Sequence, residues 1–340
     1  MTNPRQTPTI SSVTVDRRQD GTHKICWKTR RTELEIKIFA GDSPETIART
    51  SPVAVVKDVN CAEIPGLDPQ VRYYFDVVPG DGPGTISASR RVPLEGVANF
   101  RDLGGYETSK GRRVRWGQVF RSGHLAKLTA QDKLLLRRMG IQLVCDFRTP
   151  EEIKAQPDWL PDDGALQYLH LPIVHGELDP AVAMERMQKG DISWLTEDFM
   201  VKRYIEKIDR FPHVWGQIFE RLADPQSRPL VFHCTAGKDR AGACAALILL
   251  ALDVPAATVI HDHGLSNVYN AHVLKMINTR VRAMGIDPAE VRAYFTAPRG
   301  AIAALVDHIT ATYGSAAAYL QTKAGLGPEK IALLKQQLLD

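Results

Sequence analysis

The chain has 340 residues, which is enough for two domains that each bury a core of their own. Its formal net charge is +4 at pH 7 and no dense run of lysine and arginine occurs, which argues against a nucleic-acid-binding protein. The longest apolar stretch, residues 241–252, is too short to span a bilayer, so it predicts a buried helix.

Residues 1–9 are polar and contain proline, without the apolar segment of a secretory signal, and we expect a flexible tail there. The five cysteines are odd in number and include no C-x-x-C pair, so we expect no disulfide framework. Free thiols are typical of reducing compartments, and we therefore expect a cytoplasmic protein. Export without a signal peptide remains open.

Residues 10–92 contain short runs rich in β-branched and aromatic residues, separated by turn residues. Many short strands at this spacing predict an antiparallel β-sandwich. The expected strands are 12–15, 24–27, 34–39, 53–56 and 73–78.

One segment of this region, residues 66–77, resembles the Leu-x-Pro…Tyr-x-Phe-x-Val segment of fibronectin type III domains. Tyr73, Phe75 and Val77 have the period-two spacing that puts side chains on one face of a strand. The resemblance also implies that Trp27 is buried in the core of a fibronectin type III-like domain. The alternative is a β-rich extension of the domain that follows.

Residues 93–340 change to strands that alternate with helices, which predicts a parallel-rich sheet covered by helices. Strands are expected at 116–121, 141–147, 166–173 and around Val231 and Phe232. Helices are expected at 129–139, 181–189, 194–209, 213–223 and 241–252, and then to the end with breaks near Gly264, Gly285, Pro298, Gly314 and Gly327. The helices between residues 180 and 223 either form a lid over the site or cover the sheet.

The loop after the strand at Val231 contains Cys234 and, six residues later, Arg240. A thiolate is a good nucleophile, and the arginine fork binds two phosphate oxygens at once. A loop between a strand and a helix N-terminus also gathers backbone N–H groups around an anion. The pattern therefore predicts phosphoryl transfer through a cysteinyl-phosphate. The expected phosphate-binding residues are Thr235, Ala236, Gly237, Lys238, Asp239 and Arg240.

The segment from His233 to Arg240 resembles the HCxxGKDR loop of the atypical tyrosine phosphatases of bacteria and fungi, which include dual- and triple-specificity enzymes. Similar motifs of that family stand, in order, at residues 99–106, 119–123, 146–152, 265–267 and 313–320. The resemblance covers about residues 94–340 and implies a cysteine-phosphatase fold. It implies phosphotyrosine as substrate, with phosphoserine, phosphothreonine and phosphoinositides as further candidates. The alternative is a buried structural cysteine before a core helix.

Two further residues of the loop have expected roles, besides the nucleophile Cys234 and the phosphate-binding Arg240. His233 is expected to order the loop by hydrogen bonding rather than to accept a proton. Lys238 is either a solvated surface lysine or a second cation for phosphates beyond the scissile one. Lipid phosphatases of the phosphatase-and-tensin type also carry a loop lysine.

The leaving group needs a proton from a carboxylic acid, and the candidates are Asp239 and Asp146. The resemblance permits either, and Asp239 is favoured because it lies inside the loop. A carboxylate bound to an arginine stays ionised and cannot serve as an acid. The lesser candidates, each of which could equally form a structural ion pair, are Arg101, Asp102, Arg121 and Arg148.

We expect no metal and no cofactor. His261 and His263 are two residues apart, so on a helix they do not face each other, and no third ligand is evident. Cys145, one residue before Asp146, is interpreted as a buried inert thiol, with a reversible disulfide to Cys234 as the alternative.

The expected function is that of a cysteine-dependent phosphatase. One alternative is a catalytically weak adaptor that binds phospho-ligands and whose N-terminal domain binds a protein partner. Another is an enzyme of sulfur transfer or arsenate reduction. One position departs from the family that the loop resembles. The residue after the loop arginine is usually Ser or Thr there, and here it is Ala241, which predicts slow hydrolysis of the phosphoenzyme.

Overall fold

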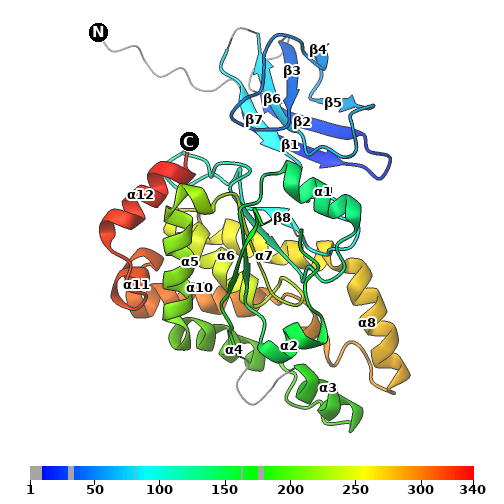
Figure 1. Ribbon diagram of the computed structural model, residues 1–340, viewed down its shortest axis with the longest axis vertical. Coiled ribbons are helices and arrows are strands. Elements are labelled where there is room, and N and C mark those ends of the chain that lie inside the picture. Colours follow the sequence, from blue (N-terminus) through cyan, green and yellow to red (C-terminus); the bar gives the residue numbers. More distant parts are fainter. Residues whose placement is uncertain (1–9, 30–33, 81, 162–163, 175–179) are drawn as a thin grey trace. The chain divides into compact units, whose positions relative to one another are not determined.

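The computed structural model describes residues 10–29, 34–80, 82–161, 164–174 and 180–340. The tail expected at residues 1–9 lies outside the described residues. The chain divides into two compact units, one of residues 1–92 with 134–139 and the other of residues 93–133 and 140–340 (Figure 1).

The first unit consists of two antiparallel sheets, as the sandwich prediction requires. One sheet has the order β1-β2-β5 and the other β4-β3-β6-β7. The strands β5 and β7 were not among the predicted ones. The strands are β1 (Ile10–Arg17), β2 (His23–Thr29), β3 (Glu35–Gly41), β4 (Ala54–Lys57), β5 (Cys61–Ile64), β6 (Tyr74–Pro79) and β7 (Thr85–Ala88).

The core of this unit lies between the two sheets. Trp27 from one sheet and Phe75 and Val77 from the other belong to the same buried cluster, and Tyr73 packs against it. The expected shared face of Tyr73, Phe75 and Val77 and the buried position of Trp27 are therefore present in the structure.

The prediction of a chain without disulfides is wrong for one pair of cysteines. Cys26 on β2 lies directly opposite Cys61 on β5, and the two form a disulfide. The pairing depends on the register of a strand that the sequence did not indicate. The argument for a reducing compartment loses its basis with this bond. The other three cysteines, Cys145, Cys234 and Cys244, are free and buried.

The second unit is built on a five-stranded sheet with the order β11-β10-β12-β9-β8. The first four strands of that order are parallel and only β8 is antiparallel, as the alternation of strands and helices predicts. The strands are β8 (Arg101–Asp102), β9 (Val119–Ser122), β10 (Leu143–Asp146), β11 (Gln167–His170) and β12 (Leu230–His233).

Helices of the second unit lie on both sides of this sheet (Figure 1). The helices of the described chain are α1 (Ala130–Arg138), most of which belongs to the first unit, and α2 (Pro150–Ala155), α3 (Pro180–Gln188), α4 (Glu197–Arg210), α5 (Pro212–Ala223), α6 (Arg240–Ala251), α7 (Ala256–Tyr269), α8 (Ala271–Ala283), α9 (Arg292–Phe295), α10 (Arg299–Tyr313), α11 (Ala316–Thr322) and α12 (Pro328–Leu338). The break expected near Gly264 is wrong, because α7 continues through it to Tyr269. One glycine costs a helix only about 1 kcal/mol, which packing readily offsets.

Helix α6 is the central helix of the unit. It is apolar on nearly all sides and packs against β9, β12 and α7. The loop between β12 and α6 consequently lies at the carboxyl end of the parallel strands, where open α/β sheets bind their ligands. Among the described residues, no helix combines the length and apolar character that a membrane crossing requires.

Candidate active site

The backbone of the loop from Thr235 to Arg240 has its N–H groups and its carbonyl groups in different environments. The carbonyl oxygens of Thr235, Ala236, Gly237 and Lys238 accept hydrogen bonds from the surrounding protein. The N–H groups of residues 235–240, in contrast, donate to no acceptor among the described residues. Six unused donors in one short loop at a helix N-terminus are an anion-binding arrangement.

The groups that bind these carbonyls come from distant parts of the chain. Asn99 donates from Nδ2 to the oxygens of Ala236 and Gly237, at 3.1 and 3.0 Å. Asn270, at the end of α7, donates to Ala236 as well, at 3.1 Å. The backbone of His124 donates to Thr235 at 3.1 Å. These contacts hold the loop in its anion-binding shape.

Gly237 is required at its position in the loop. Its φ is +67°, a left-handed conformation that favours glycine, and a Cβ there would lie 2.4 Å from the backbone oxygen of Ser122. The Arg-Ser-Gly segment on β9 thus lies directly against the loop.

A buried ionic cluster lies beneath the loop. Arg121 donates to Asp262 at 2.8 Å and to the backbone oxygen of Gly237 at 2.7 Å. Arg101 also donates to Asp262, at 3.1 Å, and all three side chains are at most 1% exposed. Burial lowers the pKa of Arg121 to about 10 despite the nearby Asp262. Asp262 is therefore a counter-ion for two arginines, which explains the His-Asp-His segment without a metal.

Arg240 is oriented by Glu152. Its two Nη atoms donate to the two carboxylate oxygens of Glu152 at 2.6 and 2.7 Å. Burial alone would lower the pKa of Arg240, but its hydrogen bonds to this carboxylate raise the pKa above its ordinary value. Glu152 is itself fixed by the capping box that it forms with Thr149 at the start of α2.

Asp239 and Lys238 form an ion pair within the loop. The ammonium of Lys238 lies 2.7 Å from the Asp239 carboxylate and donates also to the backbone oxygen of Tyr294. The hydroxyl of Tyr204 donates to Asp239 at 2.7 Å. Burial would raise the pKa of Asp239, but Lys238, Lys207 and Tyr204 lower it. Lys238 is 8% exposed, so it is not the solvated surface lysine of the alternative interpretation.

Asp146, the other candidate acid, belongs to a separate cluster. Arg148 donates to both of its oxygens, and Tyr168 donates to it at 2.8 Å. Burial would raise the pKa of Asp146, but His233 and Arg148 lower it to about 2. Arg148 also lies 2.8 Å from Asp158, which in turn lies 3.1 Å from Nε2 of His233. These two aspartates and His233 could approach a metal ion together, but the guanidinium of Arg148 already contacts oxygens of both carboxylates.

The other supporting candidates have structural contacts. Asp102 accepts hydrogen bonds from the backbone of Gly104 and Gly117, and thereby fixes the turn after β8. Burial raises the pKa of the Cys145 thiol to about 12, which fits an inert thiol.

A cavity of about 210 Å³ opens above Cys234. Its lining includes the loop residues Cys234, Thr235, Ala236, Lys238, Asp239 and Arg240, and Glu152. Helix α4 forms another wall, and α9 contributes Tyr294 and Phe295. Of the helices expected between residues 180 and 223, α4 thus borders the site, whereas α5 packs in the core of the unit. Asp239 lines the cavity and Asp146 does not.

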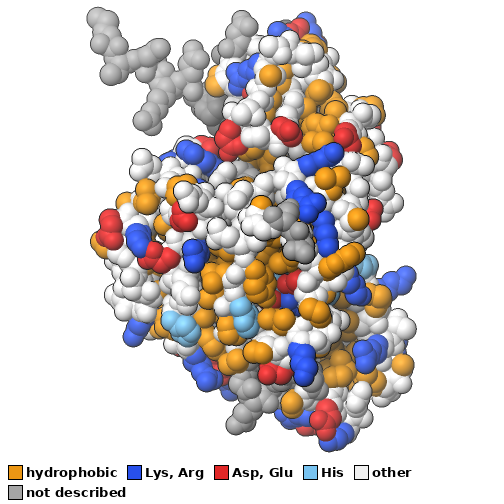
Figure 2. Space-filling model, in the orientation of Figure 1, with side chains coloured by type: hydrophobic (Ala, Val, Ile, Leu, Met, Phe, Trp, Pro, Cys, Tyr) orange, Lys and Arg blue, Asp and Glu red, His pale blue; other side chains and the backbone are white. Residues whose placement is uncertain are grey.

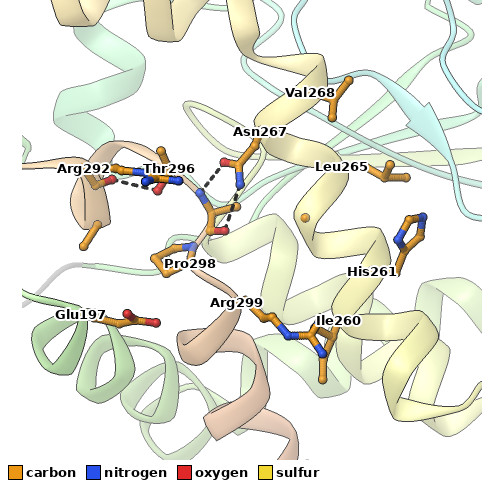
Figure 3. Close-up of a pocket in the computed structure, with 13 residues that line it drawn as sticks. Glu197, Ile260, His261, Leu265, Asn267, Val268, Arg292, Thr296, Pro298 and Arg299 are labelled. Carbon is orange, nitrogen blue, oxygen red and sulfur yellow. Dashed lines mark hydrogen bonds between the residues drawn. The ribbon is translucent and has the colours of Figure 1, made fainter. Parts of the chain in front are cut away.

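A second cavity, of about 680 Å³, lies among α7, α9 and the start of α10 (Figure 3). Asn267 spans its upper part, where its amide donates to the backbone oxygen of Ala297 and accepts from the Ala297 N–H. The Leu-Ser-Asn motif at residues 265–267 therefore fixes the connection between α9 and α10.

On the face of the molecule that Figure 2 shows, acidic and basic side chains are interspersed.

Several residues of the site were missed by sequence reasoning. Glu152 and Asn99 belong to recognised motifs but were not assigned to the site, and Asp262 was considered only as a metal ligand. Asn270, Tyr204 and Lys207 carry no local signal, because their roles depend on how α4 and α7 pack against the loop.

Comparison with known proteins agrees with this geometry. The sequence profile of the tyrosine phosphatase family matches residues 92–340. A candidate tyrosine-protein phosphatase of Cupriavidus necator is 32% identical over 72% of this chain and 88% of its own length. A tyrosine-protein phosphatase of Nostoc commune is 25% identical over 92% of this chain and 98% of its own length. The triple specificity protein phosphatase of Mycobacterium tuberculosis is 27% identical over 72% of this chain and 98% of its own length.

Proposed function

Because the chain belongs to the tyrosine phosphatase family, we propose that it hydrolyses phosphotyrosine and related phosphate monoesters through a cysteinyl-phosphate on Cys234. The observation that carries the proposal is the loop with six unused N–H donors around the thiol. These donors and the Arg240 fork stabilise charge on the transferring phosphoryl group without any rearrangement of the loop.

The reaction has two steps. The Cys234 thiolate attacks phosphorus, a sulfur–phosphorus bond forms, and the bond to the leaving oxygen breaks. Water then attacks the phosphoenzyme, the sulfur–phosphorus bond breaks, and inorganic phosphate and the thiolate are released. A proton must reach the leaving oxygen in the first step and must be taken from water in the second.

We assign the proton transfers to Asp239 rather than to Asp146. Asp239 lines the cavity, whereas Asp146 is held on both oxygens by Arg148. The neighbouring cations and Tyr204 lower the pKa of Asp239. A phosphate dianion beside the carboxylate raises that pKa, because a second negative charge disfavours ionisation.

The nature of the leaving group separates the substrate classes. Phosphotyrosine is the first candidate, with phosphoserine, phosphothreonine and phosphoinositides after it. A side-by-side turnover assay on a phosphotyrosine peptide, a phosphoserine peptide and a short-chain phosphoinositide tests the proposal. Cys234→Ser should abolish turnover and retain phosphate binding, because the loop donors remain. Residual activity above about a thousandth of wild type would contradict a cysteinyl-phosphate route.

The N-terminal unit is proposed to be a fibronectin type III-like domain that binds a protein partner. What supports this is the pair of antiparallel sheets with Trp27, Phe75 and Val77 in the core between them. A pull-down with residues 10–92 alone, against the same fragment denatured and immobilised, tests the role. A native fragment that retains nothing beyond the denatured control would contradict it.

A further inference from the structure

Lys207 is a buried lysine in the wall of the catalytic cavity. It stands on α4 and lines the cavity together with Cys234, although only 4% of the residue is exposed. Its ammonium donates one hydrogen bond, to the backbone oxygen of Arg203 at 2.8 Å. An ammonium has three donors, and the other two find no acceptor among the described residues.

The position of Lys207 is fixed by its backbone surroundings. Nε1 of Trp215 donates to the backbone oxygen of Lys207 at 2.9 Å, and the hydroxyl of Tyr319 donates to that of Ile208 at 2.6 Å. Both donors are fully buried. These bonds fix the backbone of α4 beside the cavity, and the hydrogen bond to Arg203 orients the ammonium.

Among the described residues, no carboxylate is hydrogen-bonded to Lys207, although Asp239 acts on it electrostatically and its ammonium lies 4.9 Å from the centre of the Tyr204 ring. The basic side chains in the lining are Arg203, Lys207, Lys238 and Arg240, and the acidic ones are Glu152 and Asp239. Glu152 is bound to Arg240, and Asp239 to Lys238. Arg203, one turn before Lys207, pairs with Glu206 at 3.3 Å. A buried cation without a hydrogen-bonded carboxylate is costly, so a bound anion would stabilise it.

We propose that Lys207 binds a second phosphate group of the substrate, on a carbon next to the one that carries the scissile phosphate. The inference rests on the proposed function, because the scissile phosphate must occupy the Cys234 loop. The loop donors and Arg240 already serve that phosphate, and Lys238 is engaged by Asp239. Lys207 is thus a specificity-determining residue that favours vicinal bisphosphates over monophosphates.

Burial supports this assignment, because it lowers the pKa of Lys207 to about 7 while Asp239 opposes the shift. The free enzyme therefore loses the charge of Lys207 near neutral pH. The preference for a bisphosphate should fall as pH rises through about 7, since kcat/KM reports the free enzyme. Lys207→Arg, whose charge persists at every working pH, should remove this pH dependence.

The experiment compares kcat/KM of the full chain for a dioctanoyl phosphatidylinositol monophosphate and for the matched vicinal bisphosphate. A parallel arm uses the two headgroups without lipid tails, which separates phosphate recognition from lipid recognition. The variants are Lys207→Met, which keeps the length of the side chain, and Lys202→Met as control. Lys202 is an exposed lysine on the same helix.

Lys207→Met should lower kcat/KM for the bisphosphate by about tenfold to a hundredfold, the usual effect of a hydrogen bond to a charged group. It should lower kcat/KM for the monophosphate by a smaller factor, because there it acts only through the pKa of Asp239, and Lys202→Met should leave both unchanged. Equal loss on both substrates would overturn the proposal, because Lys207 would then act on the scissile phosphate. No loss, or a loss confined to the lipid arm, would also overturn it.

Two controls separate the tested effect from misfolding and from failure of the proposed function. Thermal unfolding of Lys207→Met should show no loss of stability, since the change removes a charge that burial disfavours, so a kinetic loss cannot be attributed to misfolding. If wild type fails to hydrolyse a simple aryl phosphate, it is the proposed function that fails, before any variant is compared.

Discussion

Arg121 and Asp262 form an ion pair of 2.8 Å directly beneath the Cys234 loop, and both side chains are essentially unexposed. The same Arg121 donates to the backbone oxygens of Gly237 and Lys238. The carboxylate of Asp262 therefore positions the loop through the guanidinium that it neutralises.

Asp262→Asn should disrupt this arrangement, because two buried arginines lose their counter-ion. Breaking a buried pair costs about 3–5 kcal/mol. We expect a lower free energy of unfolding together with weaker phosphate binding, measured by denaturant titration and calorimetry. Asp307→Asn, at an exposed position on α10, is the matched control. A variant of unchanged stability would show that Arg101 and Arg121 are neutralised in another way.

The two candidate acids can be separated by the leaving group. Asp239→Asn should lower kcat/KM, which reports the step that releases the leaving group, by about a hundredfold or more on phenyl phosphate, the usual effect of a lost general acid. On p-nitrophenyl phosphate, whose leaving group needs no proton, the loss should stay below about tenfold. Asp146→Asn should change kcat/KM on both substrates by the same factor. It should also lower the free energy of unfolding, because Arg148 loses a partner. The opposite pattern would make Asp146 the acid.

Ala241 should make hydrolysis of the phosphoenzyme slow. The position is fully buried at the start of α6, and it lacks the hydroxyl that could donate to the cysteine sulfur. Such a hydrogen bond is worth about 1.5–3 kcal/mol. Wild type should show a pre-steady-state burst of phenol, and Ala241→Ser should raise kcat and shrink the burst. Serine is preferred over threonine because it adds less volume to a packed site. Without a burst in wild type, this interpretation fails.

Lys207 should make stability depend on pH. Its pKa in the fold is about 7, below the ordinary 10.5. Between these values the unfolded chain binds the proton and the native protein does not, so native stability rises with pH in that window. Lys207→Met should therefore exceed wild type by on the order of a few kcal/mol below pH 7, and the difference should shrink toward pH 10. Denaturant titrations from pH 6 to 10, with Lys202→Met as control, measure this. A difference that stays constant would mean that the charge of Lys207 is compensated.

Residues 93–340 alone should fold and hydrolyse an aryl phosphate. Every residue of the loop and of its carbonyl and ionic contacts lies in this range. The measurement is kcat/KM of the fragment beside that of the full chain, with circular dichroism to show that the fragment folds. A folded but inactive fragment would show that the N-terminal unit completes the site.

Local sequence signals predicted the layered α/β sheet, most helices and the Cys234 loop, because strand–loop–helix patterns and loop glycines are local properties. They failed where the outcome depends on packing. The disulfide between Cys26 and Cys61 requires the β2–β5 register, and the continuation of α7 through Gly264 depends on its neighbours. The partners of Asp239 and Arg240 come from α4 and α2, so the charge balance of the cavity could not be predicted from motifs.

The residues that shape the loop are far apart in the chain. Asn99 and Arg121 bind it across separations of 137 and 116 residues, while Asn270 binds it from the other side in sequence. Contacts between residues so far apart in sequence form late in folding, after the entropy of closing long loops has been overcome. Partly folded chains should therefore contain the thiol but not the anion site. Catalytic activity should return only with the last, cooperative phase of refolding, which makes phosphate hydrolysis a direct measure of the fraction of chains that have completed it.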